Sequence, residues 1–339
     1  MLTKRERVYA TINRANLDAI PWQFNMTQAV IRKLEAYYGV EWEKALDDHV
    51  VYVTPHSLVP EDIALAPDTV RNEYGAVWRR SARDYTVGDW GELVEYPLKE
   101  PSLFGYSFPD GTRKERWDNA PQVREKYPDH FLVAHGYGLF EHGWALCGFE
   151  NYLSYVASEH KFIEELTEGL AQFSCDVTLQ LAGTGVDAIR IGDDWGFQST
   201  LMMQPDVWRK LYKKYYQRVY AAAHQVGLVV SIHSCGNITA LLPDLIEIGV
   251  QVVHPLQPEA MNVAFCQREY GRDLAFWGGL GSQSTLPYGT PDDVRREVRE
   301  RLDLFHAGGY ILAPAGSAPA ETPAENIAAI VDEARMQFA

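Results

Sequence analysis

Two residues suited to bind zinc, His233 and Cys235, stand one position apart in this sequence. They follow directly on the apolar run 228–232, and Gly236 and Asn237 behind them suit a loop that must turn sharply. Imidazole nitrogen and thiolate sulfur are side-chain ligands that zinc prefers. The pattern predicts metal or thiol chemistry at the end of a buried strand. Each residue alone is also typical of a core histidine or an inert buried cysteine.

Short apolar runs recur along the chain, and most of them are separated by helical patterns. They lie at residues 20–24, 49–54, 131–134, 187–191, 228–232, 251–254, 274–277 and 310–313. Eight strand-then-helix units over this length predict an α/β fold, specifically a (β/α)8 TIM barrel. The alternative is a doubly wound open sheet, which we consider less favoured because no glycine-rich dinucleotide turn follows the first strand.

The helical patterns between these runs have recognisable starts and apolar faces. Thr3 and Glu6 form a capping-box pattern, and Pro205 and Pro323 stand near the first turn of two helices. The predicted helices cover residues 3–14, 27–38, 138–146, 151–158, 161–184, 205–226, 239–248, 291–307 and 323–337. Residues 57–129 break the alternation, and we interpret them as a β-rich insertion that covers the binding site, within a single domain of residues 1–339.

Polar groups follow the predicted strands, and in a barrel the active site lies at these carboxyl ends. The residues there are Asn25, His56, His135, Asp193, Asp194, His233, Cys235, His254, Gln283 and the turn 314–317. Four of the ten histidines belong to this set. The sequence therefore predicts a ring of metal ligands and acid–base groups around one mouth.

Each of these residues receives an expected role and has a structural alternative. We expect His233 and Cys235 to bind metal, and Asp193, His254 and His135 to act in catalysis. The expected substrate-binding residues are Asn25, His56, Tyr137, Asp194, Trp195 and Gln283. The two aspartates are equally suited to cap the next helix, and aromatic residues most often belong to the core.

Composition limits the class of partner. The net charge of −15 argues against nucleic acid and anionic membranes, and the chain has no apolar stretch long enough to cross a membrane. The N-terminus is charged and helical, unlike a signal peptide. Four scattered cysteines fit a reducing cytoplasm rather than a disulfide framework. We expect a cytoplasmic protein with a small-molecule substrate.

Taken together, several motifs resemble the uroporphyrinogen decarboxylase-like superfamily, in particular its cobalamin-associated methyltransferase branch. They are residues 3–8 with 18–21, 144–151, 191–196, 233–237, 255–258, 278–283, and 308–314 with 323–326. The resemblance covers essentially the whole chain and implies a (β/α)8 barrel. It also implies a zinc ion held by His233, Cys235 and a third ligand in the loop after the last strand.

The resemblance further implies a reaction with a partner protein. In such methyltransferases the zinc binds a thiol acceptor, which takes a methyl group from a methylated corrinoid protein. Related members polarise a methyl donor for attack by Co(I). We therefore expect zinc and a corrinoid carried by a partner protein; a homodimer is compatible with this expectation.

This sequence departs from the family pattern at several positions. Residues 315–317, where thiol-alkylating members have a cysteine, are Ala-Gly-Ser, and Gly281 replaces an acidic residue of many relatives. Either His254 or a carboxylate such as Asp193 would then complete the zinc site, or zinc binds weakly or not at all. Residues 21–26 lack the arginines of true uroporphyrinogen decarboxylases, which argues against a porphyrinogen substrate.

Two other functions stay open. One is a metal-independent decarboxylase or lyase of the same superfamily that acts on a non-porphyrin substrate, with Asp193 and the histidines in acid–base roles. The other is a non-enzymatic binding or scaffold protein on a degenerate barrel, which the polar strand ends make the least favoured.

Overall fold

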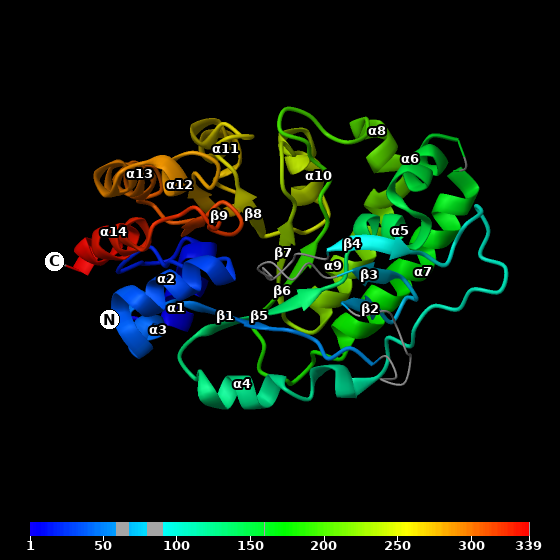
Figure 1. The fold of residues 1–339 in the computed structure, drawn as a ribbon, viewed down its shortest axis with the longest axis horizontal. Coiled ribbons are helices and arrows are strands. Elements are labelled where there is room, and N and C mark those ends of the chain that lie inside the picture. Colours follow the sequence, from blue (N-terminus) through cyan, green and yellow to red (C-terminus); the bar gives the residue numbers. More distant parts are fainter. Residues whose placement is uncertain (59–67, 80–90, 159, 339) are drawn as a thin grey trace.

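The computed structural model describes residues 1–58, 68–79, 91–158 and 160–338, and its centre is a curled parallel sheet with helices outside it (Figure 1). In spatial order the seven strands are β1 (Val50–Val53), β5 (Phe131–Gly136), β6 (Ala188–Gly192), β7 (Val229–His233), β8 (Val252–Leu256), β9 (Ala275–Leu280) and β10 (Tyr310–Pro314). The order never reverses, so the alternative of a doubly wound sheet is wrong.

The first predicted strand, residues 20–24, lies between the two edge strands of this sheet. Leu312 on β10 donates its N–H to Pro21 O at 2.9 Å, and His49, just before β1, donates to Trp22 O at 3.0 Å. The regular pairing is limited to a single parallel bridge between Trp22 and Leu312. Pro21 has no N–H to contribute to a ladder, which accounts for the short pairing.

Helices cover the outside of the sheet (Figure 1). They are α1 (Lys4–Asn13), α2 (Gln28–Tyr38), α3 (Trp42–Leu46), α4 (Ala120–Lys126), α5 (Phe140–Cys147), α6 (Phe149–Ser158), α7 (His160–Leu179), α8 (Pro205–Trp208), α9 (Lys214–Gln225), α10 (Leu242–Glu247), α11 (Val263–Tyr270), α12 (Thr285–Tyr288), α13 (Pro291–Leu304) and α14 (Ala324–Arg335). The Thr3–Glu6 capping box is present. A π-helical turn, Arg209–Lys213, divides the predicted helix 205–226, and the sequence patterns missed α3, α11 and α12.

A small antiparallel sheet lies within the predicted insertion. Its strands are β2 (Thr69–Arg71), β3 (Val77–Arg79) and β4 (Glu92–Glu95). Trp78 on β3 packs edge to face on Trp144 of α5, with ring centres 5.6 Å apart, which fixes this sheet beside α5 (Figure 1). Residues 59–67 and 80–90 of the predicted insertion lie outside the described residues.

The core has two parts because successive side chains of a strand point to opposite faces. On β6, Ile189 and Ile191 pack against the helices, whereas Ala188 belongs to an apolar cluster inside the curled sheet. Arg190 shares the inner face with Ala188. Within the described part of the chain, no helix is both long and apolar enough to cross a membrane.

Candidate active site

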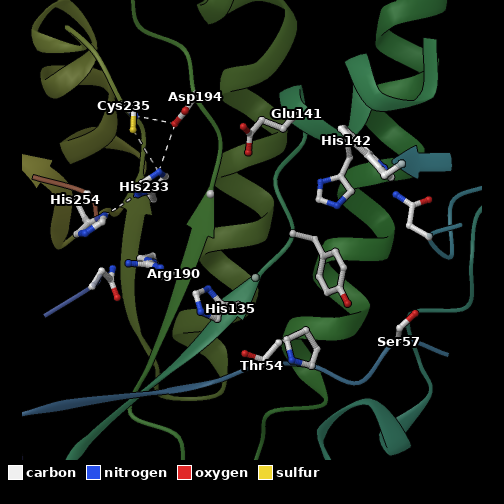
Figure 2. Close-up of a pocket in the computed structure, with 18 of the residues that line it drawn as sticks. Thr54, Ser57, His135, Glu141, His142, Arg190, Asp194, His233, Cys235 and His254 are labelled. Atoms are coloured by element: carbon white, nitrogen blue, oxygen red, sulfur yellow. Dashed lines mark hydrogen bonds and ion pairs between the residues drawn. The ribbon is translucent and has the colours of Figure 1, made fainter. Parts of the chain in front are cut away.

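A cavity of about 660 Å³ opens at the carboxyl ends of the strands (Figure 2). Seven of the residues predicted from the sequence line it: Asn25, His135, Tyr137, Asp194, His233, Cys235 and His254. They come from separate segments of the chain, brought together because parallel strands end at one edge of the sheet. The structure thus gathers most of the predicted residues at a single cavity.

Three possible metal ligands meet on two adjacent strands. His233 is the last residue of β7 and pairs in register with Gly192 of β6, so the loops that follow carry Cys235 and Asp194 side by side (Figure 2). His233 Nε2 lies 3.5 Å from Asp194 Oδ1 and 3.7 Å from Cys235 Sγ. All three ligand atoms lie within 4.8 Å of one another.

The spacing of these three atoms fits a zinc ion. Tetrahedral zinc with bonds of about 2.0–2.3 Å separates neighbouring ligand atoms by roughly 3.4–3.6 Å. The distances from His233 Nε2 to the other two ligand atoms are close to this range. Nitrogen, sulfur and carboxylate oxygen are all common zinc ligands. The residues present therefore fit the metal that the resemblance implies.

A second histidine lies behind the first. β7 and β8 pair in register at His233 and His254, and their Nδ1 atoms are 2.7 Å apart. One of the two nitrogens must carry the shared proton. His233 Nε2 faces Cys235 and Asp194, so a His233 that binds metal through Nε2 would carry its proton on Nδ1 and donate it to His254 Nδ1. His254 contacts His233 from behind and is not one of the three clustered ligand residues.

Both imidazoles of this pair are neutral. Burial lowers the pKa of His233 to about 4, although the carboxylate of Asp194 acts in the opposite direction. Burial, the charge of Arg190 and the neighbouring histidines hold the pKa of His254 well below its usual value. A neutral imidazole has a free lone pair, so this environment keeps His233 ready to bind a cation.

The adjacent aspartates have different surroundings, and the structure corrects the role expected of Asp193 in the metal site. Asp193 is fully buried and does not line the cavity. Its carboxylate accepts hydrogen bonds from the amides of Leu139, Phe140 and Glu141 at the start of α5, and from the Tyr216 hydroxyl. Asp193 therefore anchors this helix, and Asp194 is the carboxylate brought to His233 and Cys235.

Three further predicted residues lie away from the cavity wall. His56 is exposed, although Pro55 and Ser57 beside it line the cavity. Trp195 is fully buried and donates from Nε1 to the Tyr216 hydroxyl at 3.3 Å. Gln283 is exposed. Substrate binding by His56, Trp195 and Gln283 gains no support from this geometry and stays a prediction.

Sequence reasoning missed three charged residues of the cavity, Arg71, Glu141 and Arg190. Arg190 had a signal, because it is a lone charge at an inward position of an otherwise apolar strand. Glu141 lies in the first turn of α5, and nothing in its local pattern distinguishes it. Burial, with the nearby charges of Asp194 and Asp193, raises the pKa of Glu141 well above its usual value.

The loop after β10 does reach the cavity. Gly316 and Ser317 line it, at the place where thiol-alkylating relatives would supply a cysteine. This loop therefore presents a hydroxyl group where the family pattern predicts a third sulfur, while Asp194 approaches the other two ligands from β6.

Comparison with known proteins shows the family. The family model Uroporphyrinogen decarboxylase (URO-D) matches residues 142–337, more than half of the chain. The methylcobamide:CoM methyltransferase MtaA of Methanosarcina barkeri is 24% identical over 210 residues, which are 62% of this chain and 59% of that protein. The methylated-thiol–coenzyme M methyltransferase of Methanosarcina mazei is 24% identical over 190 residues, 55% of this chain and 48% of that protein.

The chain thus spans less than two thirds of the length of either curated relative. A solved structure, a methyltransferase from Methanosarcina mazei, has a TM-score of 0.74 and 19% identity over 100% of both chains, which shows the shared fold. The chain belongs to the uroporphyrinogen decarboxylase (URO-D) family, and the curated relatives it matches are methyltransferases, as the resemblance predicted.

Proposed function

We propose that this protein transfers a methyl group between a small molecule and a corrinoid carried by a partner protein, with a zinc ion held by His233, Cys235 and Asp194. The observation that carries the proposal is the meeting of these three ligand atoms within 4.8 Å at one cavity. The matched relatives, named as methylcobamide:CoM and methylated-thiol methyltransferases, support the reaction class.

The zinc would supply Lewis acidity, which favours a thiolate or polarises the group that bears the methyl. The surrounding residues would prepare this site. His254 fixes the ring of His233 through the 2.7 Å contact, and the Cys235 amide donates to Asp194 Oδ1 at 2.7 Å. Glu141, whose pKa is raised by burial and by the nearby charges of Asp194 and Asp193, would be the acid placed to protonate a leaving atom of the substrate.

The whole fold also enters the proposal. Residues 20–24 would act as the eighth strand of a closed (β/α)8 barrel, since they bond to β10 on one side and to His49, just before β1, on the other. The chain would form one domain with the small β-sheet as an insertion at the cavity mouth. The corrinoid protein would approach this open end, and a homodimer remains a prediction.

Metal content tests the proposal directly. We expect about one zinc per chain in the purified protein, and loss of most of it in Cys235→Ser and Asp194→Asn. Cys266→Ser is the matched control, because Cys266 is a buried cysteine on α11 outside the cavity wall. Zinc-dependent change in the visible spectrum of methylcobalamin with added thiols would report methyl transfer; full activity in zinc-free protein would contradict the proposal.

A metal-independent decarboxylase or lyase acting on a non-porphyrin substrate is the second candidate. The observation in its favour is a cavity with a buried arginine and no third sulfur at residues 315–317. Release of carbon dioxide by chelator-treated protein without any corrinoid would favour this function over methyl transfer.

A further inference from the structure

Arg190 is a buried charge on the inner face of the sheet, in the wall of the cavity. Only 7% of the residue is exposed, and it lines the same cavity as His233 and Cys235. Figure 2 shows it below His233, between His254 and His135. A guanidinium that is this buried has little contact with water and needs compensation from its surroundings.

The partners of Arg190 are neutral. Nη1 donates to the Tyr52 hydroxyl at 2.7 Å, and the guanidinium lies 4.5 Å from the centre of the Tyr52 ring and 5.6 Å from that of Trp277. Over residues 1–58, 68–79, 91–158 and 160–338, no carboxylate forms an ion pair with it. The two rings fix the guanidinium in position without neutralising its charge.

Other buried arginines of the protein are paired differently. Arg7 bonds to the Asp18 carboxylate at 2.7 Å, and Arg116 bonds to Glu73 at the same distance. Both are more than nine-tenths buried, like Arg190. The fold therefore supplies a carboxylate where a buried arginine is structural, and Arg190 is an exception located at the cavity.

His135 offers an unsatisfied polar group beside Arg190, its register partner on the neighbouring strand. Its Nε2 is buried and has no hydrogen-bond partner among the described residues. The ring stacks on Tyr52 at 4.8 Å, and burial together with the Arg190 charge lowers the pKa of His135 to about 3. A neutral imidazole in this place can donate one N–H to a ligand but adds no charge.

The charges of the metal ligands leave Arg190 uncompensated. A zinc ion carries two positive charges, which the Cys235 thiolate and the Asp194 carboxylate would balance. The guanidinium would then remain a positive charge without a counter-ion, because its hydrogen-bond and ring partners, Tyr52 and Trp277, are neutral. The complementary ligand group is an anion.

We propose that Arg190, assisted by His135, binds an anionic oxyacid group of the substrate, a carboxylate or a sulfonate, while the reactive end of the substrate lies at His233, Cys235 and Asp194. The inference rests on the proposed function and specifies its substrate class. The planar fork of an arginine matches two oxygens of such a group, and hydrogen bonds to a charged acceptor are about twice as strong as neutral ones.

Calorimetry with matched thiols tests this assignment. The probes are 3-mercaptopropionate, 3-mercapto-1-propanesulfonate and the neutral 3-mercapto-1-propanol, each added to the zinc-loaded protein. We expect at least one anion to bind about tenfold or more tightly than the neutral thiol. The anion that binds more tightly shows whether the site prefers a carboxylate or a sulfonate.

Variants then assign the preference to Arg190. We expect Arg190→Gln to abolish the anion preference and Arg190→Lys to weaken it, because an ammonium is shorter and lacks the fork. Arg71→Gln is the matched control: Arg71 also lines the cavity but has Glu95 at 3.5 Å. Equal preference in wild type and Arg190→Gln, or none in the wild type, would overturn the assignment.

Two further measurements separate the possible failures. We expect propionate to bind the chelator-treated protein and to lose this binding in Arg190→Gln, because the contact needs no zinc. Failure of the metal proposal would therefore leave this outcome intact. Circular dichroism reports whether Arg190→Gln folds. If it does not, Arg190→Lys decides the matter, since an unchanged anion preference in that variant contradicts the proposal.

Discussion

Charged side chains near the two ends of strand β6 differ in their partners. At its amino end Asp187 is fully buried and meets Arg5 at 2.7 Å, Arg124 at 2.5 Å and the Leu132 amide at 2.8 Å. Toward its carboxyl end Arg190 has a phenol and two aromatic rings as partners, and Asp194 faces the cavity. The buried charge at the amino end of β6 therefore has oppositely charged partners, whereas Arg190, toward the carboxyl end, has none among the described residues and lines the cavity.

The same contrast extends to neighbouring elements. Near the amino ends of the strands, Arg7 pairs with Asp18, and Arg14 donates to the carbonyl oxygens of Gly271 and Leu274. Such fully satisfied groups contribute to stability but have no capacity left for a ligand. The cavity groups have that capacity, which indicates that charge without a protein partner marks the functional end of this fold.

Removing Asp187 should have the largest effect on stability. Asp187→Ala leaves Arg124, Arg5 and a buried amide without their acceptor, and we expect the free energy of unfolding to fall by about 3–5 kcal/mol. Urea denaturation measures the loss. Asp206→Ala removes an exposed ion pair with Arg209 and should cost less than about 1 kcal/mol; equal losses would contradict the structural role of Asp187.

The adjacent aspartates allow a sharper version of the test. Asp193→Ala removes the acceptor of three amides at the start of α5, and we expect a loss of about 2–4 kcal/mol in unfolding free energy. Asp194→Ala should cost about 1 kcal/mol or less, because one amide bond is lost. Zinc content should behave in the reverse order, with Asp194→Ala depleted and folded Asp193→Ala retaining metal.

His254 should act on the metal only through His233. His254→Phe removes the acceptor of the His233 Nδ1–H, and we expect zinc affinity to fall by about 10–100-fold, measured by competition with a chromophoric chelator. His142→Phe is the control, because His142 lines the cavity on α5 while His254 contacts His233 directly. An unchanged affinity in His254→Phe would mean that the pair has no role in orienting the ligand.

Hydrophobic periodicity predicted most strands of the central sheet, because buried strands appear in the sequence as short apolar runs. The carboxyl ends of these strands in turn predicted where the cavity lies. It could not predict that residues 20–24 form one bridge rather than a full strand, because Pro21 and the closing geometry decide this. Helices α11 and α12 are short, and short elements carry little periodic signal.

In the cavity wall, the sequence predicted the place of His233 and Cys235 from residue type and from their position after a strand. It could not distinguish Asp193 from Asp194, because successive residues after a strand point in opposite directions. Only the packing of α5 shows that the Asp193 carboxylate is occupied by hydrogen bonds from the helix amides. Arg190 was readable as a charge inside an apolar strand. Its lack of a carboxylate partner is a tertiary property that no local pattern contains.

The smallest expected effect is on the pH dependence of the unfolding free energy, through a histidine near the amino ends of the strands. His49, near the amino ends of the strands, lies 2.8 Å from Arg7, and burial with this charge lowers its pKa to about 2. The unfolded chain binds a proton at His49 below about pH 6.5, whereas the folded protein does not. Stability should therefore fall as the pH drops below 6.5, by about 1.4 kcal/mol per pH unit for this group.

Urea denaturation between pH 6.5 and pH 5 measures this dependence. His49→Gln should lessen the acid slope by about one proton, and His56→Gln provides a control at an exposed position. Added zinc should oppose protonation of His233, because the metal competes with the proton for the same nitrogen. It should not affect protonation of His49, which lies near the amino ends of the strands, away from the cavity. If added zinc changed the His49-dependent part of the slope of unfolding free energy against pH, the two ends of the sheet would not be independent. That result would contradict the distinction between a structural end and a ligand-binding end.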